Sequence, residues 1–255
     1  MAEGREQMQA VVSTLSHELR SPMAIVKAAL ANLREEVGGT LTDTQATWVA
    51  TAERQCDRLL RLIQNHLEFS RLTSGRVRLT RTRVSLSPLL EQVRDDFQHQ
   101  AKARGLELTL ELEEDLPEIE ADPDSLVQVL HNLIGNALRF ASAQVRIEAC
   151  RDMGEVRLSV CDDGPGIDPL RAAMLFDHYT QLARQADVDG YKGTGLGLAI
   201  AREIVNLHDG RLWVESIPGA GARFHCVFPA VVELVAPPPP VNPVVPAPFA
   251  TAEGF

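Results

Sequence analysis

Two long stretches near the N-terminus carry apolar residues at alternating spacings of three and four, and this pattern limits the fold more than any other feature of the chain. The stretches span residues 8–37 and 43–71, with Gly38 and Gly39 between them. Such spacing places one apolar face along a helix that packs lengthwise against other helices. The faces comprise Val12, Leu15, Leu19, Met23, Val26, Leu30, Leu33 and Val37 in the first stretch, and Trp48, Ala52, Cys56, Leu59, Ile63 and Leu67 in the second.

A hairpin of two such helices has too small a core to bury both faces by itself. Two copies packed as a four-helix bundle bury them, so we predict a homodimer built on residues 1–74.

The periodicity changes after Thr73-Ser74-Gly75 and indicates a second domain over residues 75–232. Strands are predicted over 76–84, 106–112, 145–149, 155–161, 211–215 and 222–228. Helices are predicted over 87–104, with Ser87-Pro88 as cap and first turn, 123–141 and 195–208. This mixture predicts a two-layer α/β sandwich, so the whole chain is of the α+β class. Residues 233–255 are rich in proline and are predicted to form a disordered tail.

Composition excludes several functions. The formal net charge of −10 disfavours direct binding to nucleic acid or to an anionic bilayer. The four cysteines are scattered without a C-x-x-C pair, which argues against a metal cluster and for a reducing compartment. No apolar run reaches about 18 residues and no signal peptide is evident, so we expect no membrane insertion and a cytoplasmic location. The chain is then either a soluble protein or the soluble part of a larger membrane-bound one.

Residues 132–140 carry a polar face within the predicted helix 123–141. Asn132, Asn136, Arg139 and Phe140 recur at i, i+4, i+7 and i+8 and so lie on one side. A carboxamide oxygen can ligate a hard cation, and arginine can bind phosphate. A polar surface helix with two chance asparagines explains the same pattern equally well.

Two further stretches are rich in glycine. Residues 162–167 follow a predicted strand, and the Asp162 carboxylate can accept a hydrogen bond from an exocyclic amine such as that of adenine. A tight turn is the alternative interpretation. Residues 193–200 open a helix, whose free N–H groups face whatever lies there. About 25 mostly polar residues separate the two stretches and are expected to form a lid.

In this order and spacing, the three stretches resemble the N, G1 and G2 boxes of the GHKL ATPases, the superfamily that includes histidine kinases, gyrase B and MutL-type proteins. The resemblance implies that ATP binds with Mg²⁺ held by Asn136, with Asn132, Arg139 and Lys192 near the phosphates and with Asp162 at the adenine amine. The other residues it assigns to the nucleotide site are Phe140, Gly164, Gly166, Ile167, Gly193, Thr194, Gly195, Leu196 and Gly197.

Three details qualify this resemblance. Phe140 is expected to stack near adenine, where the family often has Tyr, and Asp163 replaces the common Asn of the G1 box. Residues 175–179 resemble the F box of histidine kinases, which anchors the lid, and this places Phe176 at the site.

Residues 16–22 lie on the first predicted helix, with His17 off its apolar face. A lone exposed histidine is usually without function, but Glu18 can accept the Nδ1 proton and leave Nε2 a better nucleophile. Histidine is largely neutral at pH 7, which is its nucleophilic form. Pro22 removes a helical N–H and either permits a functional bend or is simply tolerated.

This stretch resembles the H box of histidine kinases. The resemblance implies that His17 is phosphorylated from ATP and that the phosphoryl group passes to an aspartate on the receiver domain of a response regulator. Ser21 stands where the family usually has Thr, and it keeps a hydroxyl that can position water for dephosphorylating the regulator.

Two alternatives remain open. A non-catalytic dimeric scaffold would bind nucleotide or a response regulator without phosphate transfer, although the intact boxes argue against it. A mismatch-repair type of GHKL ATPase would need a further domain downstream. Few residues precede the first helix, so the input signal is expected to come from an upstream sensor module or another protein.

Overall fold

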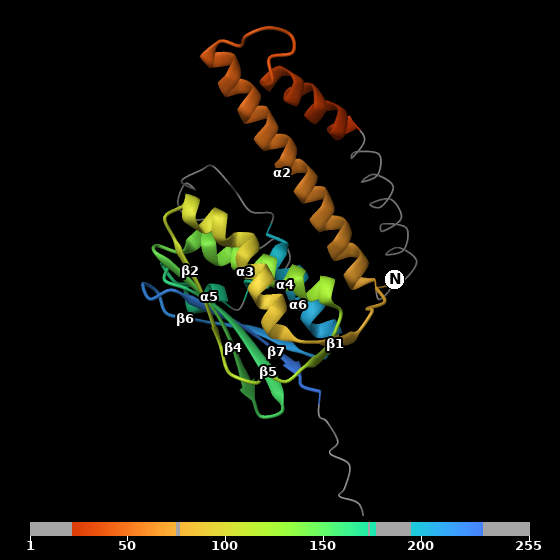
Figure 1. Cartoon of the computed structure of the whole chain (residues 1–255), viewed down its shortest axis with the longest axis vertical. Coiled ribbons are helices and arrows are strands. Elements are labelled where there is room, and N and C mark those ends of the chain that lie inside the picture. The colour runs from red at the N-terminus through yellow and green to blue at the C-terminus, as the bar shows by residue number, and fades with distance from the viewer. Residues whose placement is uncertain (1–21, 75–76, 173, 177–194, 232–255) are drawn as a thin grey trace, which may run out of the picture.

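The computed structural model describes residues 22–74, 77–172, 174–176 and 195–231. Figure 1 shows a helical hairpin that rises from a domain in which helices cover one face of a sheet.

The hairpin pairs a helix over residues 22–34 with α2 (Asp43–Thr73). A capping box begins α2: the Thr42 hydroxyl accepts from the Gln45 backbone N–H, and the Gln45 side chain accepts from the Thr42 N–H at 2.9 Å. Two ion pairs, Lys27–Asp57 at 2.8 Å and Arg34–Glu53 at 3.4 Å, join the two helices.

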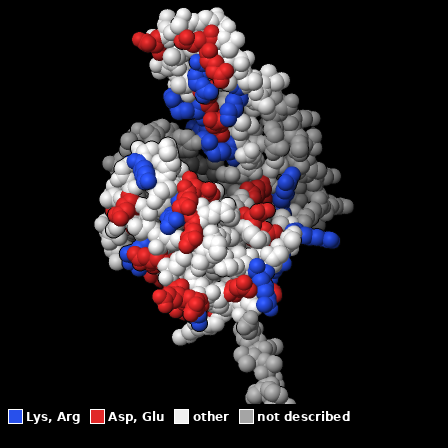
Figure 2. All heavy atoms as spheres, in the orientation of Figure 1, with Lys and Arg blue, Asp and Glu red and all other residues white. Residues whose placement is uncertain are grey.

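The predicted apolar face of α2 is only partly covered within one chain. Cys56 and Leu67 are buried, whereas Trp48 is 67% exposed and Leu59 is 48% exposed. On the other helix, Val26 and Leu33 are also exposed. The described residues of one chain therefore leave apolar surface exposed on both helices of the hairpin. Figure 2 shows acidic and basic side chains intermixed over the visible face of the hairpin.

The second domain is built on a mixed five-stranded sheet with the order β2-β4-β5-β7-β6. The strands are β2 (Glu107–Leu112), β4 (Gln144–Asp152), β5 (Glu155–Asp162), β6 (Arg211–Ser216) and β7 (Ala222–Pro229). Only the β2–β4 pair is parallel. A small antiparallel pair, β1 (Thr82–Val84) with β3 (Ile119–Ala121), lies beside the sheet and contacts the end of β7 through an Ile119–Ala230 bridge.

The helical layer consists of α3 (Leu86–Ala103), α4 (Pro123–Phe140) and α6 (Gly197–Leu207), with one short turn, α5 (Pro169–Ala172). Asp122 caps α4 by accepting from the Ser125 N–H at 3.1 Å, and Pro123 fills the first helical position. Alternate residues of the strands, such as Ile147, Val160 and Phe224, are buried against these helices. The core is mainly aliphatic, as the 5% aromatic content indicates, although Phe224 and Phe228 are among its largest fully buried side chains.

The end of α2 packs onto the second domain. Leu72 is 7% exposed and belongs to that domain's core cluster, and Phe69 packs against the same cluster. Burial raises the pKa of Glu68 above its ordinary value, although hydrogen bonding with Gln128 and the charge of Arg71 act in the opposite direction. The boundary predicted at residue 74 therefore separates two sequence patterns, but side chains on its N-terminal side pack against the core of the second domain.

Most predicted elements are present, with local corrections. The strand predicted over 76–84 is wrong for residues 77–81, because only β1 pairs with another strand. The helix α3 begins at Leu86, so its N-cap is Ser85 and the cap predicted at Ser87-Pro88 lies inside the first turn. The sequence analysis missed β3 and α5, both of which are very short. The proposed tail over 233–255 lies outside the described residues.

Candidate functional site

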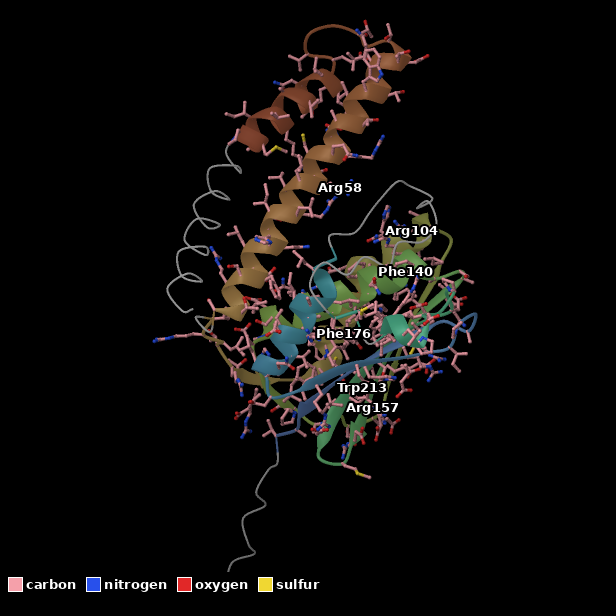
Figure 3. All side chains as sticks on the ribbon, turned by 180° about the vertical axis from the view of Figure 1, so that it is seen from behind. Arg58, Arg104, Phe140, Arg157, Phe176 and Trp213 are labelled. Atoms are coloured by element: carbon pink, nitrogen blue, oxygen red, sulfur yellow. The ribbon has the colours of Figure 1, made fainter. Side chains whose placement is uncertain are left out.

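One side of α4 carries the predicted polar face. Asn132, Asn136 and Phe140 succeed one another by single turns, and Phe140 is 39% exposed at the C-terminal end of the helix. The Arg139 guanidinium lies 5.1 Å from the centroid of the Phe140 ring, within cation–π distance. Arg104 donates to the Leu138 carbonyl at this same end of α4, and Figure 3 shows Arg104 and Phe140 there.

Asn132 meets the start of α6. A Cβ added to Gly197 would lie 3.1 Å from Asn132 Oδ1, so a side chain at that position would crowd the amide. Asn132 Nδ2 is buried and has no hydrogen-bond partner in the described part of the chain. Buried polar atoms are normally paired. The lack of a partner for Asn132 Nδ2 therefore indicates that a polar acceptor outside the described residues, such as a ligand atom, completes the site.

Asp162 is the last residue of β5, and the loop that follows it lies against the end of α4. Its Oδ1 accepts from the Gly164 N–H at 3.0 Å, and the Ala222 backbone N–H also donates to the carboxylate. Burial, with a smaller contribution from the charge of Asp163, raises the pKa of Asp162 to about 6 against the effect of these hydrogen bonds. A half-buried carboxylate of this kind is a strong acceptor for a ligand N–H donor.

Asp163 has a different role from its neighbour. Its carboxylate accepts from the backbone N–H groups of Ser142, Ala143 and Gln144 at 2.9–3.1 Å. Burial acts to raise the pKa of Asp163, but these hydrogen bonds lower it below its ordinary value. Asp163 thus holds the segment that connects α4 to β4. This structural role explains why a carboxylate can occupy the position.

The glycines of residues 162–167 are required by contacts within the protein. A Cβ on Gly164 would lie 2.4 Å from the Phe140 carbonyl oxygen, and one on Gly166, at φ +69°, would lie 2.1 Å from the Ile217 carbonyl oxygen. The predicted reason, close approach of a nucleotide, is therefore not the only one. The same contacts place this loop against the end of α4 and against the turn after β6.

Three predicted site residues lie in or near the core. Leu196 is 1% exposed and precedes α6, while the Ile167 side chain packs against the core. Phe176 is 8% exposed and packs edge-to-face against Phe224 of β7, with the Arg202 guanidinium 5.8 Å from its ring centroid. Phe176 is thus held in the core beside β7, and the segment that the F-box resemblance expects it to anchor lies outside the described residues.

Gly195, at φ +72°, directly precedes the N-cap of α6. Because Leu196 at the N-cap is aliphatic, it supplies no side-chain acceptor to the first turn of the helix. The remaining predicted site residues lie outside the described residues; they are His17, Glu18, Ser21, Lys192, Gly193 and Thr194.

Sequence analysis did not single out Ser216, the last residue of β6. Its Oγ accepts from the Ile167 N–H at 2.8 Å and donates to the Gly221 carbonyl at 2.6 Å. The available signal was weak: a strand followed by Pro218, Gly219 and Gly221 indicates a turn, but does not show which loop the turn contacts.

Residues 7–75 match the family model "His Kinase A (phospho-acceptor) domain", and residues 121–232 match "Histidine kinase-, DNA gyrase B-, and HSP90-like ATPase". None of the helices in the described part of the chain is long and apolar enough to cross a bilayer.

Two curated relatives and one solved structure illustrate the similarity. The alginate biosynthesis sensor protein KinB of Pseudomonas aeruginosa is 35% identical over 216 residues, which are 84% of this chain and 36% of KinB. The adaptive-response sensory kinase SasA of Synechococcus sp. is 31% identical over 89% of this chain and 62% of SasA. The crystal structure of full-length ShkA in complex with AMPPNP has a TM-score of 0.72 and 33% identity, over 87% of this chain and 46% of ShkA. The chain thus spans less than two thirds of each of these relatives.

Proposed function

Because the chain belongs to the sensor histidine kinases, with a phospho-acceptor module followed by an ATPase module, we propose that it phosphorylates itself on His17 at the expense of ATP. The phosphoryl group then passes to an aspartate on the receiver domain of a response regulator. We assign the adenine amine to Asp162, the phosphates to the Asn132 and Arg139 face of α4, and the Mg²⁺ ligand to Asn136.

The observation that carries this proposal is the meeting of α4, the loop after β5 and the start of α6. Asn132 brings a buried, unpartnered Nδ2 atom, as judged over the described residues, to the first turn of α6. The loop after β5 brings a half-buried carboxylate to the end of α4. An adenine nucleotide offers an amine for Asp162 and phosphate oxygens for N–H donors, so its chemistry fits both.

The proposed transfer is a substitution at the γ-phosphorus. Nε2 of His17 forms a bond to phosphorus as the bond to the β–γ bridging oxygen breaks, and ADP leaves with that electron pair. Glu18 accepts a hydrogen bond from the Nδ1 proton, which makes Nε2 more nucleophilic and stabilises the positive ring that forms. Mg²⁺, when bound at Asn136, neutralises charge on the phosphates.

We further propose that the working form is a homodimer and that the chain acts in the cytoplasm. The exposed apolar residues of the hairpin, such as Trp48 and Leu59, support the dimer because a second hairpin can cover them. The sensor input is proposed to come from another module or protein.

Two variants test the assignment of the chemistry. His17→Gln is expected to abolish autophosphorylation while ADP binding is retained, because the acceptor and the nucleotide site lie on different modules. Asn136→Ala is expected to weaken nucleotide binding in Mg²⁺ but to have little effect in EDTA. Labelling from γ-labelled ATP, as acid-labile and alkali-stable phosphate, measures the first effect; titration with a fluorescent nucleotide measures the second. Persistent labelling of the His17 variant would show that the acceptor is wrongly assigned.

A further inference from the structure

We propose that Ser216 is a positioning residue that holds the loop 162–167 in the shape that aims the Asp162 carboxylate at a bound adenine. The inference rests on the proposed ATP site and adds to it a residue that does not touch the nucleotide.

The hydroxyl of Ser216 joins two backbone segments that are far apart in the sequence. It accepts from the N–H of Ile167, in the loop after β5, and donates to the carbonyl of Gly221, in the turn between β6 and β7. Both bonds are partly buried. Loss of the hydroxyl therefore leaves a shielded N–H and a shielded carbonyl without these partners, which is more costly than losing an exposed hydrogen bond.

The same two segments are in very close backbone contact. The Gly219 N–H donates to the Pro165 carbonyl at 2.7 Å. A Cβ on Gly221, at φ +85°, would lie 1.9 Å from the Asp162 carbonyl oxygen. The turn after β6 and the loop after β5 thus form one unit, in which Ser216 supplies a side-chain bond that substitution can remove without a new clash.

This unit sets the direction of the Asp162 carboxylate. The carboxylate accepts from Gly164, which belongs to the loop, and from Ala222, which follows the turn. The orientation of the side chain therefore depends on the relative position of the two segments that Ser216 joins.

Open space behind the unit makes the Ser216 bonds important. A cavity of about 450 Å³ lies against it, lined in part by Asp162, Ser216, Ile217 and Gly221. Among the described residues, packing does not fill this side, so a loop released from Ser216 has room to shift. Small displacements of a recognition group reduce binding strongly, because a hydrogen bond to a carboxylate depends on direction.

The test compares ADP with inosine diphosphate, whose ring has an oxygen in place of the adenine amine, on the full chain. Wild type is expected to prefer ADP. Ser216→Ala is expected to bind ADP roughly ten-fold more weakly, the size of a lost partly buried hydrogen bond, and to bind inosine diphosphate within about two-fold of wild type. Ser216→Thr keeps the hydroxyl and is expected to restore the preference.

Ser159→Ala is the matched control. Ser159 is a buried serine of the same sheet whose Oγ lies 2.8 Å from His225 Nδ1. Its loss is expected to lower thermal stability without changing the ratio of the two nucleotide affinities, because neither residue belongs to the loop or the turn.

The outcomes separate this inference from the proposed function. If wild type prefers ADP and Ser216→Ala keeps that preference, or if Ser216→Ala weakens both nucleotides equally, Ser216 has only a structural role and the inference is wrong. If wild type shows no preference for ADP, the adenine assignment of Asp162 fails and the inference fails with it. The inference is supported if Ser216→Ala loses the preference for ADP over inosine diphosphate while wild type, Ser216→Thr and Ser159→Ala keep it.

Discussion

Asp162 and Asp163 are adjacent carboxylates whose surroundings push them toward opposite behaviour. Burial raises the pKa of Asp162 to about 6, whereas three backbone donors lower that of Asp163. The hydrogen-bonding capacity of the Asp163 carboxylate is therefore used by backbone groups of the protein, whereas the Asp162 carboxylate keeps capacity to accept a hydrogen bond from a ligand. Such a contrast between neighbours is typical of a functional site, where one group is left incompletely satisfied.

The raised pKa of Asp162 has a defined effect on stability. Its folded value of about 6 exceeds the ordinary 3.8, so the stability it contributes is present below pH 3.8 and lost as the pH rises through about 6. We expect Asp162→Asn to be more stable than wild type without ligand at pH 7.5, and to lose most of that advantage at pH 4.5. Thermal melting at the two pH values measures the difference.

The same variant is expected to bind ADP about ten- to a hundred-fold more weakly at pH 7.5, since a hydrogen bond to a charged acceptor contributes about 1.5–3 kcal/mol. Titration with ADP measures this loss. A variant that is destabilised at pH 7.5 yet binds ADP normally would contradict both the burial cost and the adenine assignment.

At the scale of elements, the two ends of α2 are stabilised by different kinds of interaction. Its N-terminal end is closed by a local capping box, and its C-terminal end is buried against the ATPase module. The first contribution follows from residues close in sequence, while the second depends on residues more than fifty positions away, such as Gln128 beside Glu68.

Two threonines of α2 are expected to respond with opposite signs to the same substitution. Thr42→Ala removes the N-cap acceptor and is expected to destabilise the hairpin by about 1 kcal/mol. Thr47→Ala lies inside the helix, where the hydroxyl only bonds back to the Asp43 carbonyl, and is expected to stabilise by a few tenths of a kcal/mol. Urea denaturation followed by circular dichroism measures both; equal effects would refute the capping role.

Leu72→Ala tests the packing of α2 on the ATPase module. The side chain is 7% exposed within that module's core cluster, so its truncation is expected to cost about 2–4 kcal/mol. Gln64→Ala, at an exposed position of the same helix, is the control and is expected to change stability by less than about 0.5 kcal/mol. Calorimetry of the full chain measures both. If the Leu72 variant melts like the control, the contact is not maintained in solution.

At the scale of the whole molecule, the hairpin has apolar side chains that the described residues leave exposed. Exposed apolar residues occur on both of its helices, including Ile25, Val26 and Trp48, and at Val37 in the turn that follows the first helix. Ion pairs join the helices within the hairpin, and the exposed apolar surface is available to the second copy that we propose.

We therefore expect light scattering at micromolar concentration to give twice the 28.0 kDa of one chain. Trp48→Glu is expected to shift the mass toward that of a monomer, because a charge at a buried bundle position is costly. Thr47→Glu places the same charge on the neighbouring exposed residue and is expected to remain dimeric. A wild-type mass near 28.0 kDa would contradict the dimer.

Local patterns predicted much of this protein. The helical hairpin, α4, α6 and most strands of the sheet follow from apolar spacing alone, because 3.6-residue and two-residue periods are properties of neighbouring residues. The stretches around Asn132, Asp162 and Gly197 resemble the N, G1 and G2 boxes of the GHKL ATPases in order and spacing, and that resemblance implied a nucleotide site. Elements of three or four residues, such as β3, carry too short a pattern to be predicted.

The tertiary structure decided what distant segments do to one another. In the fold, the Asp163 carboxylate accepts from the backbone N–H groups at Ser142–Gln144. A side chain at Gly166 would clash with the Ile217 carbonyl, and the Ser216 hydroxyl accepts from the Ile167 N–H. Each of these depends on contacts between residues well separated along the chain, and side-chain periodicity holds no information about which loops meet at the end of a sheet. The sequence alone thus determined the elements and their motifs, whereas only the fold determined how the loops around Asp162 support one another.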